Sequence, residues 1–142
     1  MAEKKPIVSL EVRVHWGDMD AMQHVNNIVY LKWVESTRLL LFEQLMKNET
    51  AGVSEIGPIL AWSDMKYIAP VVYPDTVKID FDITKLEEDR LQCQAHLYSS
   101  KQNRLVAISN NTIKAFDIKA LKKAEIPPYW IQRLRAHYGE SI

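Results

Sequence analysis

The segment from residue 28 to residue 46 constrains the fold most, because its pattern predicts a helix with little polar surface. At about 100° per residue the apolar side chains cover about half of the circumference. They are Ile28, Tyr30, Leu31, Val34, Leu39, Leu41, Phe42, Leu45 and Met46, and the remaining sector holds Val29, Trp33 and Leu40. Such a helix is expected to be wrapped by the chain rather than laid on its surface. We expect it to run from Asn27 to about Lys47, with Asn26 or Asn27 as its N-cap.

The flanking sequence alternates apolar and polar residues with the period of two that is typical of half-buried strands. Strands are predicted over residues 8–14, 60–68, 77–84, 91–98 and 105–118. A loop that holds Gly52, Gly57 and Pro58 is expected before the second strand, and Pro127-Pro128 is expected to begin a short helix over 129–138. We also expect an exposed edge strand at 90–99, which would pair with another chain.

This order of elements predicts an α+β fold, in which an antiparallel sheet of about five strands wraps around one long central helix. A short C-terminal helix completes it. The length of 142 residues fits one domain, residues 1–142.

Composition and single residue types exclude several classes of function. Lys and Arg together equal Asp and Glu at 18 each, which argues against a nucleic-acid partner. The first residues lack an apolar leader, and no run of about 18 apolar residues follows, so we expect a cytoplasmic protein without a membrane partner. The one cysteine, Cys93, is expected to face the core. The four histidines show no ligand spacing, so no metal is expected. No Gly-x-Ser-x-Gly motif is present for a serine nucleophile.

The turn before the long helix carries two carboxylates, Asp18 and Asp20, next to the unpaired N–H groups of a helix N-terminus. A carbonyl bound there could accept a hydrogen bond from the helix while a carboxylate attacks it or deprotonates a water. The same spacing also fits a cap or a partner of the helix dipole. His24 likewise fits either a base or a packed or capping histidine.

Two further polar features lie in apolar surroundings. Glu35 falls inside the apolar sector of the helix, so we expect it to be paired, with Lys32 or Arg38 as local partners, or functional. The run Ser109-Asn110-Asn111 interrupts the last long strand and predicts a bulge or an unusual packing site.

Taken together, one set of residues resembles a known family. The set comprises Asp18-Met-Asp20, His24-Val-Asn-Asn27, Tyr30, Trp33, Glu35, Tyr67-Ile-Ala-Pro70, Tyr73-Pro-Asp75-Thr-Val, Leu105-Val-Ala107 and Ile126-Pro-Pro128. It resembles the hotdog-fold acyl-CoA thioesterases of the 4-hydroxybenzoyl-CoA thioesterase group, and Gln-His-Val-Asn-Asn is also similar to plant acyl-ACP thioesterases. The likeness extends over nearly the whole chain.

The resemblance implies that Asp20 is the general base or nucleophile and that the Asn27 backbone N–H polarises the thioester carbonyl. It implies a positioning role for His24 and substrate contacts for Asn26, Tyr30, Glu35 and Met22. It further implies a homodimer or homotetramer with the site between subunits, and no cofactor.

The chain also departs from these families. Met22 stands where the plant enzymes carry Asn, Val71 and Val72 stand near their later carboxylate and thiol, and Asn27 replaces the histidine of a bacterial subgroup.

The expected reaction is therefore hydrolysis of an acyl thioester, with acyl-CoA favoured over acyl-ACP for a chain of this length. A non-catalytic acyl-thioester binding or regulatory module is the alternative, and such a module needs no carboxylate facing the carbonyl. Arg90, Lys101 and Arg104 are either contacts for CoA phosphates or solvated surface charges.

Overall fold

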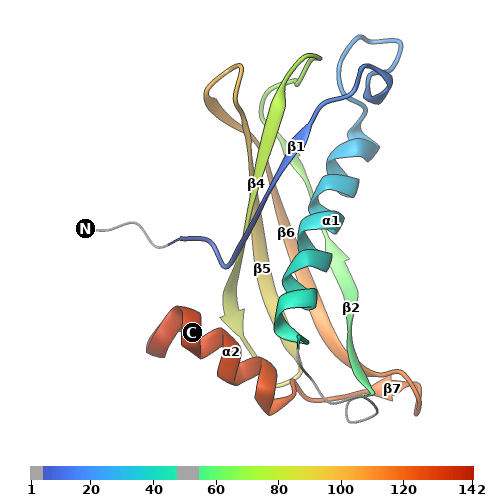
Figure 1. The fold of residues 1–142 in the computed structure, drawn as a ribbon. Helices are drawn as coiled ribbons and strands as arrows, with labels where there is room; N and C mark the ends of the chain where they lie inside the picture. Colours follow the sequence, from blue (N-terminus) through green and yellow to red (C-terminus); the bar gives the residue numbers. More distant parts are fainter. Residues whose placement is uncertain (1–4, 48–54) are drawn as a thin grey trace.

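The computed structural model describes residues 5–47 and 55–142, and the part of the predicted loop around Gly52 lies outside them. One antiparallel sheet runs in the order β1-β4-β5-β6-β2, with β3 and β7 each paired to β6 (Figure 1). The strands are β1 Val8–Arg13, β2 Ile56–Ser63, β3 Lys66–Tyr67, β4 Thr76–Leu86, β5 Arg90–Ser99, β6 Arg104–Asp117 and β7 Lys122–Lys123. The helices are α1 Asn27–Leu45 and α2 Pro128–Tyr138, and short 3-10 turns span Trp16–Asp18 and Gly139–Ser141.

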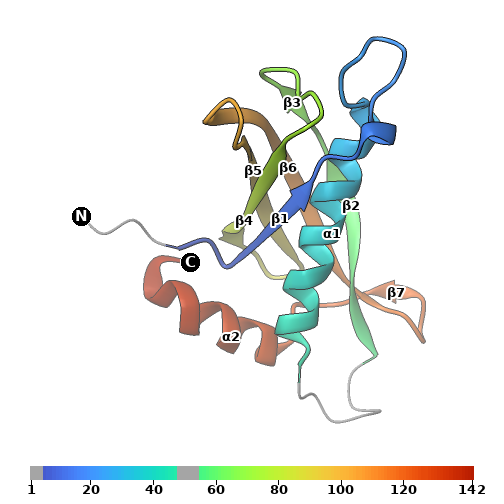
Figure 2. The ribbon, with the colours of Figure 1, turned by 45° about the horizontal axis from the view of Figure 1, so that its top comes forward.

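The long helix α1 lies in the curve of the sheet and packs against β1 and β4 (Figure 2). Its buried side chains are Tyr30, Trp33, Val34, Thr37, Leu41, Phe42 and Leu45. They meet strand residues that alternate as the sequence predicts, for example Val77, Ile79, Phe81 and Ile83 on β4. Cys93 on β5 is buried in the same core, which confirms the prediction for this thiol.

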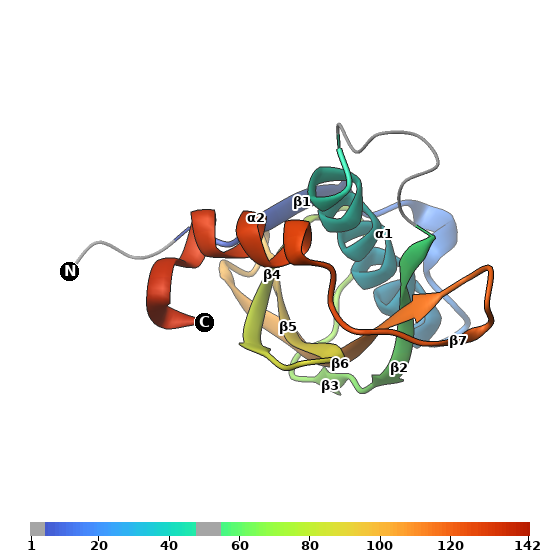
Figure 3. The ribbon, with the colours of Figure 1, turned by 90° about the horizontal axis from the view of Figure 1, so that it is seen from below.

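The sheet wraps around α1 as expected, but it leaves one side of the helix open in a single chain. The sheet curves round one side of the helix only (Figure 3), and Ile28 and Leu39 on the other side are 65% and 57% exposed. Glu35, which the helical wheel grouped with these two residues, is exposed as well, so the prediction of a buried charge is wrong. The wheel placed these side chains together correctly, but periodicity does not say which apolar stripe the sheet covers.

The second strand differs from the predicted range 60–68. Strand β2 begins at Ile56 and ends at Ser63, and Asp64 then bends the chain before β3 by accepting the Asn110 backbone N–H at 2.7 Å. Gly57 and Pro58 therefore lie inside a strand rather than in a loop. A Cβ on Gly57 would lie 2.9 Å from Ile118 Cδ1, which explains a glycine there, and a proline is tolerated because β2 is an edge strand.

The prediction that 90–99 forms an exposed edge is wrong, because β5 pairs with β4 on one side and β6 on the other. The edges of the main sheet are β1 and β2. Strand β7 was not predicted, since two lysines carry no alternation of apolar and polar residues.

The C-terminal helix α2 begins where the proline pair predicts, with Pro127 as N-cap and Pro128 as first helical residue. Its Trp130 ring lies 5.3 Å from the ring of Phe42 at the end of α1. The Tyr138 hydroxyl donates to Asp82 at 2.7 Å and accepts the Ile83 backbone N–H at 2.9 Å. Helix α2 thus covers the core at the end of the sheet away from the α1 N-terminus (Figure 1).

Candidate active site

The connection from β1 to α1 holds Asp20 in a tight turn. Its carbonyl oxygen accepts the Gln23 N–H, its carboxylate Oδ1 accepts the Met22 N–H at 2.9 Å, and Gln23 adopts a φ of 61°. The second carboxylate oxygen of Asp20 has no hydrogen-bond partner among the described residues. The Asp18 carboxylate has another partner: it accepts the His15 N–H and closes the preceding turn. One of the two predicted carboxylates therefore has a structural role, and Asp20 retains a free oxygen.

The start of α1 leaves the Asn27 backbone N–H without an acceptor in the part of the chain that the structure describes. The sequence predicted Asn26 or Asn27 as the N-cap, and the structure has Asn26. Its side chain accepts the Ile28 N–H at 3.0 Å. Its carbonyl oxygen accepts the Val29 N–H. The Asn27 N–H has no acceptor among residues 5–47 and 55–142, and it lies at the positive end of the helix dipole. Such a group can donate to an oxygen that gains negative charge.

One depression adjoins this helix start and another adjoins the Asp20 turn. The first, about 250 Å³, is lined by Asn27 and His24 together with Val25, Tyr30, Tyr67, Ile68, Ala69 and Pro70. The second, about 500 Å³, is lined by Asp20 together with Trp16, Met19, Ala21, Gln23 and Val72. Within one chain, the free amide and the free carboxylate therefore border neighbouring depressions rather than a shared one. The segment 67–72 contributes residues 67–70 to the first depression and Val72 to the second.

Two tyrosines form the aromatic side of the first depression. The ring centres of Tyr30 and Tyr67 lie 5.1 Å apart in an edge-to-face arrangement, and the Tyr67 hydroxyl donates to the Asn27 carbonyl oxygen at 3.2 Å. Burial raises the pKa of Tyr30, partly opposed by a backbone hydrogen bond with Val71, and burial also raises the pKa of Tyr67. Both hydroxyls are therefore protonated donors at neutral pH. Tyr67 belongs to the residues that resemble the family, but it was not predicted as a site residue. Its contact with Asn27 spans 40 positions of sequence, which no local pattern reveals.

Three predicted site residues, Asn26, Met22 and Glu35, line neither depression. The Asn26 side chain caps α1 instead. Met22 is 76% exposed, and Glu35 is exposed on α1. The expected ion pair of Glu35 with Lys32 or Arg38 is missing from the ion pairs of the described residues.

The guanidinium of Arg38 is used elsewhere. It donates to the buried Asn111 Oδ1 at 3.0 Å, and the Asn111 amide donates to Ser109 Oγ at 3.0 Å. Burial lowers the pKa of Arg38, and the charge of Glu35 opposes this. The polar run on β6 is thus an unusual packing site beneath α1, one of the two alternatives that the sequence left open.

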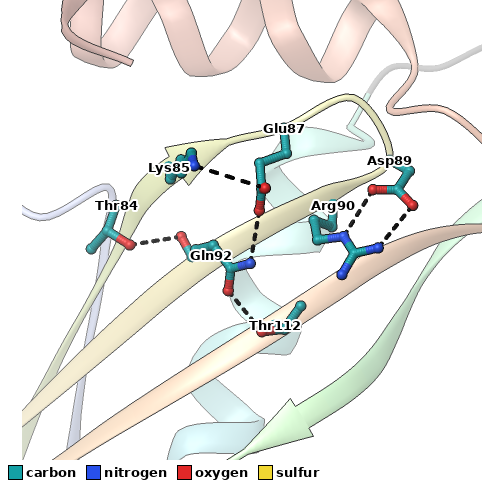
Figure 4. A network of polar contacts seen from close by, with 7 residues as sticks. All are labelled: Thr84, Lys85, Glu87, Asp89, Arg90, Gln92 and Thr112. Carbon is teal, nitrogen blue, oxygen red and sulfur yellow. Dashed lines mark hydrogen bonds and ion pairs between the residues drawn. The ribbon is translucent and has the colours of Figure 1, made fainter.

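The three basic residues considered for phosphate contacts lie at three different places. Arg90 lies at the far end of the sheet, where it makes two contacts with Asp89 at 2.8 and 3.1 Å, beside the polar network of Glu87, Gln92 and Thr112 (Figure 4). Lys101 lies at the same end as the Asn27 amide, in a groove of about 480 Å³ that Arg13 and Tyr73 also line. Arg104 lines a separate hollow of about 520 Å³.

The part of the chain that the structure describes contains no helix of the length and apolarity that a membrane span requires. In the same residues, no three side chains of His, Cys, Asp or Glu gather in a way that could hold a metal ion.

Comparisons with known proteins relate this geometry to one family. The sequence model of the Thioesterase-like superfamily matches residues 14–134 of this chain. No curated protein matches the sequence. Among solved structures, a Pseudomonas aeruginosa protein described as a candidate thioesterase has a TM-score of 0.80 at 24% identity, over 95% of this chain and 100% of its own.

Two further structures have the same fold. The DHNA-CoA thioesterase from Staphylococcus aureus has a TM-score of 0.76 at 16% identity, over 94% of each chain. A thioesterase from Thermus thermophilus complexed with coenzyme A and Zn has a TM-score of 0.79 at 20% identity, over 97% of this chain and 99% of its own. These likenesses confirm the predicted hotdog fold, in which a curled antiparallel sheet holds a long helix.

Proposed function

Because this chain belongs to the Thioesterase-like superfamily, we propose that it hydrolyses an acyl thioester to a free acid and a thiol, with acyl-CoA as the substrate. The observation that carries the proposal is the Asn27 N–H, which lacks an acceptor among the described residues and borders a depression at the start of α1. The carboxylate of Asp20 in the neighbouring depression supplies the second group that the reaction needs.

In the proposed reaction, the thioester carbonyl oxygen accepts the Asn27 N–H and Asp20 takes a proton from a water that attacks the carbonyl carbon. The resulting oxyanion strengthens its hydrogen bond to the amide, and the C–S bond breaks as the proton passes from Asp20 to the leaving sulfur. Direct attack by the Asp20 carboxylate, followed by hydrolysis of the anhydride, is the variant in which Asp20 is a nucleophile. A preorganised amide donor is worth about 3 kcal/mol, and a positioned base about 10² to 10⁴ in rate.

Other residues of the turn and helix start support this geometry. Asn26 fixes the first helical turn through its cap, and this cap orients the neighbouring amide. His24 and Tyr30 line the same depression as Asn27 and are proposed to position the substrate there. Met22 and Glu35 would contact substrate only where a second copy of the chain brings them to its site.

We propose that this second copy docks on the open side of α1 and on the edge strand β2. One edge of β2 pairs with β6, and along residues 57–63 the other edge has no strand partner among the described residues. Large apolar side chains are exposed on both elements: Ile28, Leu31, Leu39, Ile59, Leu60 and Trp62. An unpaired edge beside an apolar face favours antiparallel pairing of two β2 strands across a two-fold axis. A pair of such dimers is the tetrameric alternative.

A panel of thioesters tests the proposed function. Release of free thiol is measured with short, long and aromatic acyl-CoAs and with acyl-ACP. The aromatic members matter because one structural neighbour is named for DHNA-CoA. We expect release from at least one acyl-CoA and slower release from its acyl-ACP counterpart. Binding of acyl-CoA without release from any member would instead favour the regulatory module.

Two matched variants test the choice of carboxylate. In Asp20→Asn the amide oxygen can still accept the Met22 N–H, so the turn is retained while the base is lost. In Asp18→Asn the amide oxygen can still accept the His15 N–H. The proposal requires a large loss of rate in the first variant only, and the opposite pattern would transfer the role to Asp18.

A further inference from the structure

The segment of residues 67–72, termed the wall segment, separates the two depressions. Tyr67 and Pro70 stand in the lining of the amide side, and Val72 stands in the lining of the carboxylate side. Its position therefore contributes to the shape of both depressions at once.

The wall segment is also hydrogen-bonded to Val25, which links the Asp20 turn to α1, and to Asn27 at the start of α1. The Val71 carbonyl oxygen accepts the Val25 N–H at 2.9 Å, between the Asp20 turn and the first residue of α1. The Tyr67 hydroxyl donates to the carbonyl oxygen of Asn27. A shift of the wall segment would thus move Val25 and the helix start relative to Asp20.

One side chain from a distant turn holds the middle of this segment. The Gln102 amide, in the turn between β5 and β6, donates to the Pro70 carbonyl oxygen at 2.7 Å. Pro70 follows Ala69, whose N–H is bonded to Val106, and precedes the contact of Val71 with Val25. Gln102 therefore acts at the point where the wall segment leaves the sheet.

The turn that carries Gln102 is itself fixed. The Gln102 N–H donates to the buried Ser99 Oγ at 3.0 Å, and Ser99 Oγ donates to the Asp75 carboxylate. The other oxygen of Asp75 accepts the Lys101 N–H at 2.9 Å and the Thr76 N–H at 2.7 Å. Because these hydrogen bonds hold the backbone of the turn in place, the hydrogen bond of the Gln102 side chain can set the position of the wall segment.

We infer that Gln102 is a positioning residue for the proposed hydrolysis, acting through Pro70 on the distance between the Asp20 carboxylate and the Asn27 amide. The inference rests on the proposed function. Gln102 touches neither reactive group, so its removal should lower kcat through misplacement and leave substrate binding largely unchanged. Small misplacements of this kind can cost an order of magnitude or more in rate.

Two variants at position 102 separate the lost donor from the changed side chain. Gln102→Glu has nearly the same shape but presents an acceptor to the Pro70 oxygen. Gln102→Lys has a different shape but can still donate to that oxygen. Gln102 is exposed, so both variants should fold. The matched control is Gln94→Glu, because Gln94 is a half-buried amide donor that is bonded to Asn110, away from the two depressions.

The variants are compared by kcat, KM and melting temperature on the best acyl-CoA and on the corresponding acyl N-acetylcysteamine thioester, which has no phosphates. We expect kcat of Gln102→Glu to fall about tenfold or more on both substrates, with KM within about twofold. Gln102→Lys should recover most of kcat, and Gln94→Glu should match the wild type.

Three results would overturn the inference while leaving the proposed function intact: wild-type kcat in Gln102→Glu, an equal loss in Gln102→Lys, or a loss confined to KM for acyl-CoA. The last result would assign the effect to charge near the phosphates. If the wild type releases no thiol from any thioester, the proposed function fails and the inference falls with it.

Discussion

The substitution Asn27→Pro isolates the backbone N–H on which the proposed chemistry depends. Proline removes the amide hydrogen of residue 27 and nothing from the hydrogen bonds of the helix, because this N–H has no acceptor among the described residues. Residue 27 is the first helical position, where the fixed φ of proline is favourable. Asn26 already has φ −62° and ψ 140°, the extended conformation that a following proline requires.

The expected magnitude follows from this geometry. Stability should change by less than about 1 kcal/mol, since the ring replaces an exposed side chain at a compatible position. The rate should fall about 10²-fold to 10³-fold, the usual cost of removing one oxyanion donor. The control Asn27→Ala keeps the amide and removes only the side chain, so its rate should stay within a few-fold of the wild type.

The assay is thiol release under saturating acyl-CoA, with urea unfolding of the same preparations. A stable Asn27→Pro variant with wild-type kcat would refute the role of the amide. A loss of similar size in Asn27→Ala would transfer that role to the side chain.

Three further predictions concern packing, assembly and pH. Asn111→Ala leaves the half-buried Arg38 guanidinium without its acceptor and should cost about 1–3 kcal/mol in urea unfolding, and a cost as small as that of the exposed Asn110→Ala would contradict this. Trp62→Lys places a charge on the proposed β2 interface and should shift the sedimentation of the protein from dimer to monomer, whereas an unchanged dimer would rule out this face. Burial raises the pKa of Cys93 and of Tyr138, so the folded state keeps protons that the unfolded chain loses. The contribution of these two groups to the free energy of unfolding should therefore be fully present below about pH 9. It should fall as the pH rises further, by up to about 1.4 kcal/mol per pH unit for each group. Urea unfolding from pH 8 to 10.5 measures the slope of unfolding free energy against pH. Cys93→Ala should reduce this slope. A stability that does not change with pH would disprove the prediction.

The sequence predicted the elements whose signals are local. Alternation identified β4 and β5 to within a few residues, and the proline pair identified the start of α2. The cap at Asn26 follows from residue type next to an apolar periodic segment. In each case, the residues that determine the type of element lie within that element or directly beside it in sequence.

The errors concern relations between distant segments. The placement of β5 inside the sheet depends on β6 returning beside it, which no pattern within 90–99 reveals. The exposure of Glu35 depends on which side of α1 the sheet of one chain reaches, and the wheel carries no such information.

The candidate site divides in the same way. The turn carboxylates and the helix start were visible because they adjoin in sequence. The contact of Tyr67 with Asn27 and that of Gln102 with Pro70 cross 40 and 32 positions, so only the folded chain brings them together. Local sequence thus located the groups proposed to react, and tertiary structure was needed to find the residues that contact them.

Mass balance of the reaction tests the central claim most directly. Wild type and Asp20→Asn are incubated with one saturating acyl-CoA, and the free acid and the free thiol are both quantified over time. The account predicts equal amounts of acid and thiol from the wild type, a rate at least about 10²-fold lower in Asp20→Asn, and similar binding of acyl-CoA by both. Undiminished turnover in Asp20→Asn, or tight binding by the wild type without release of acid and thiol, would contradict it.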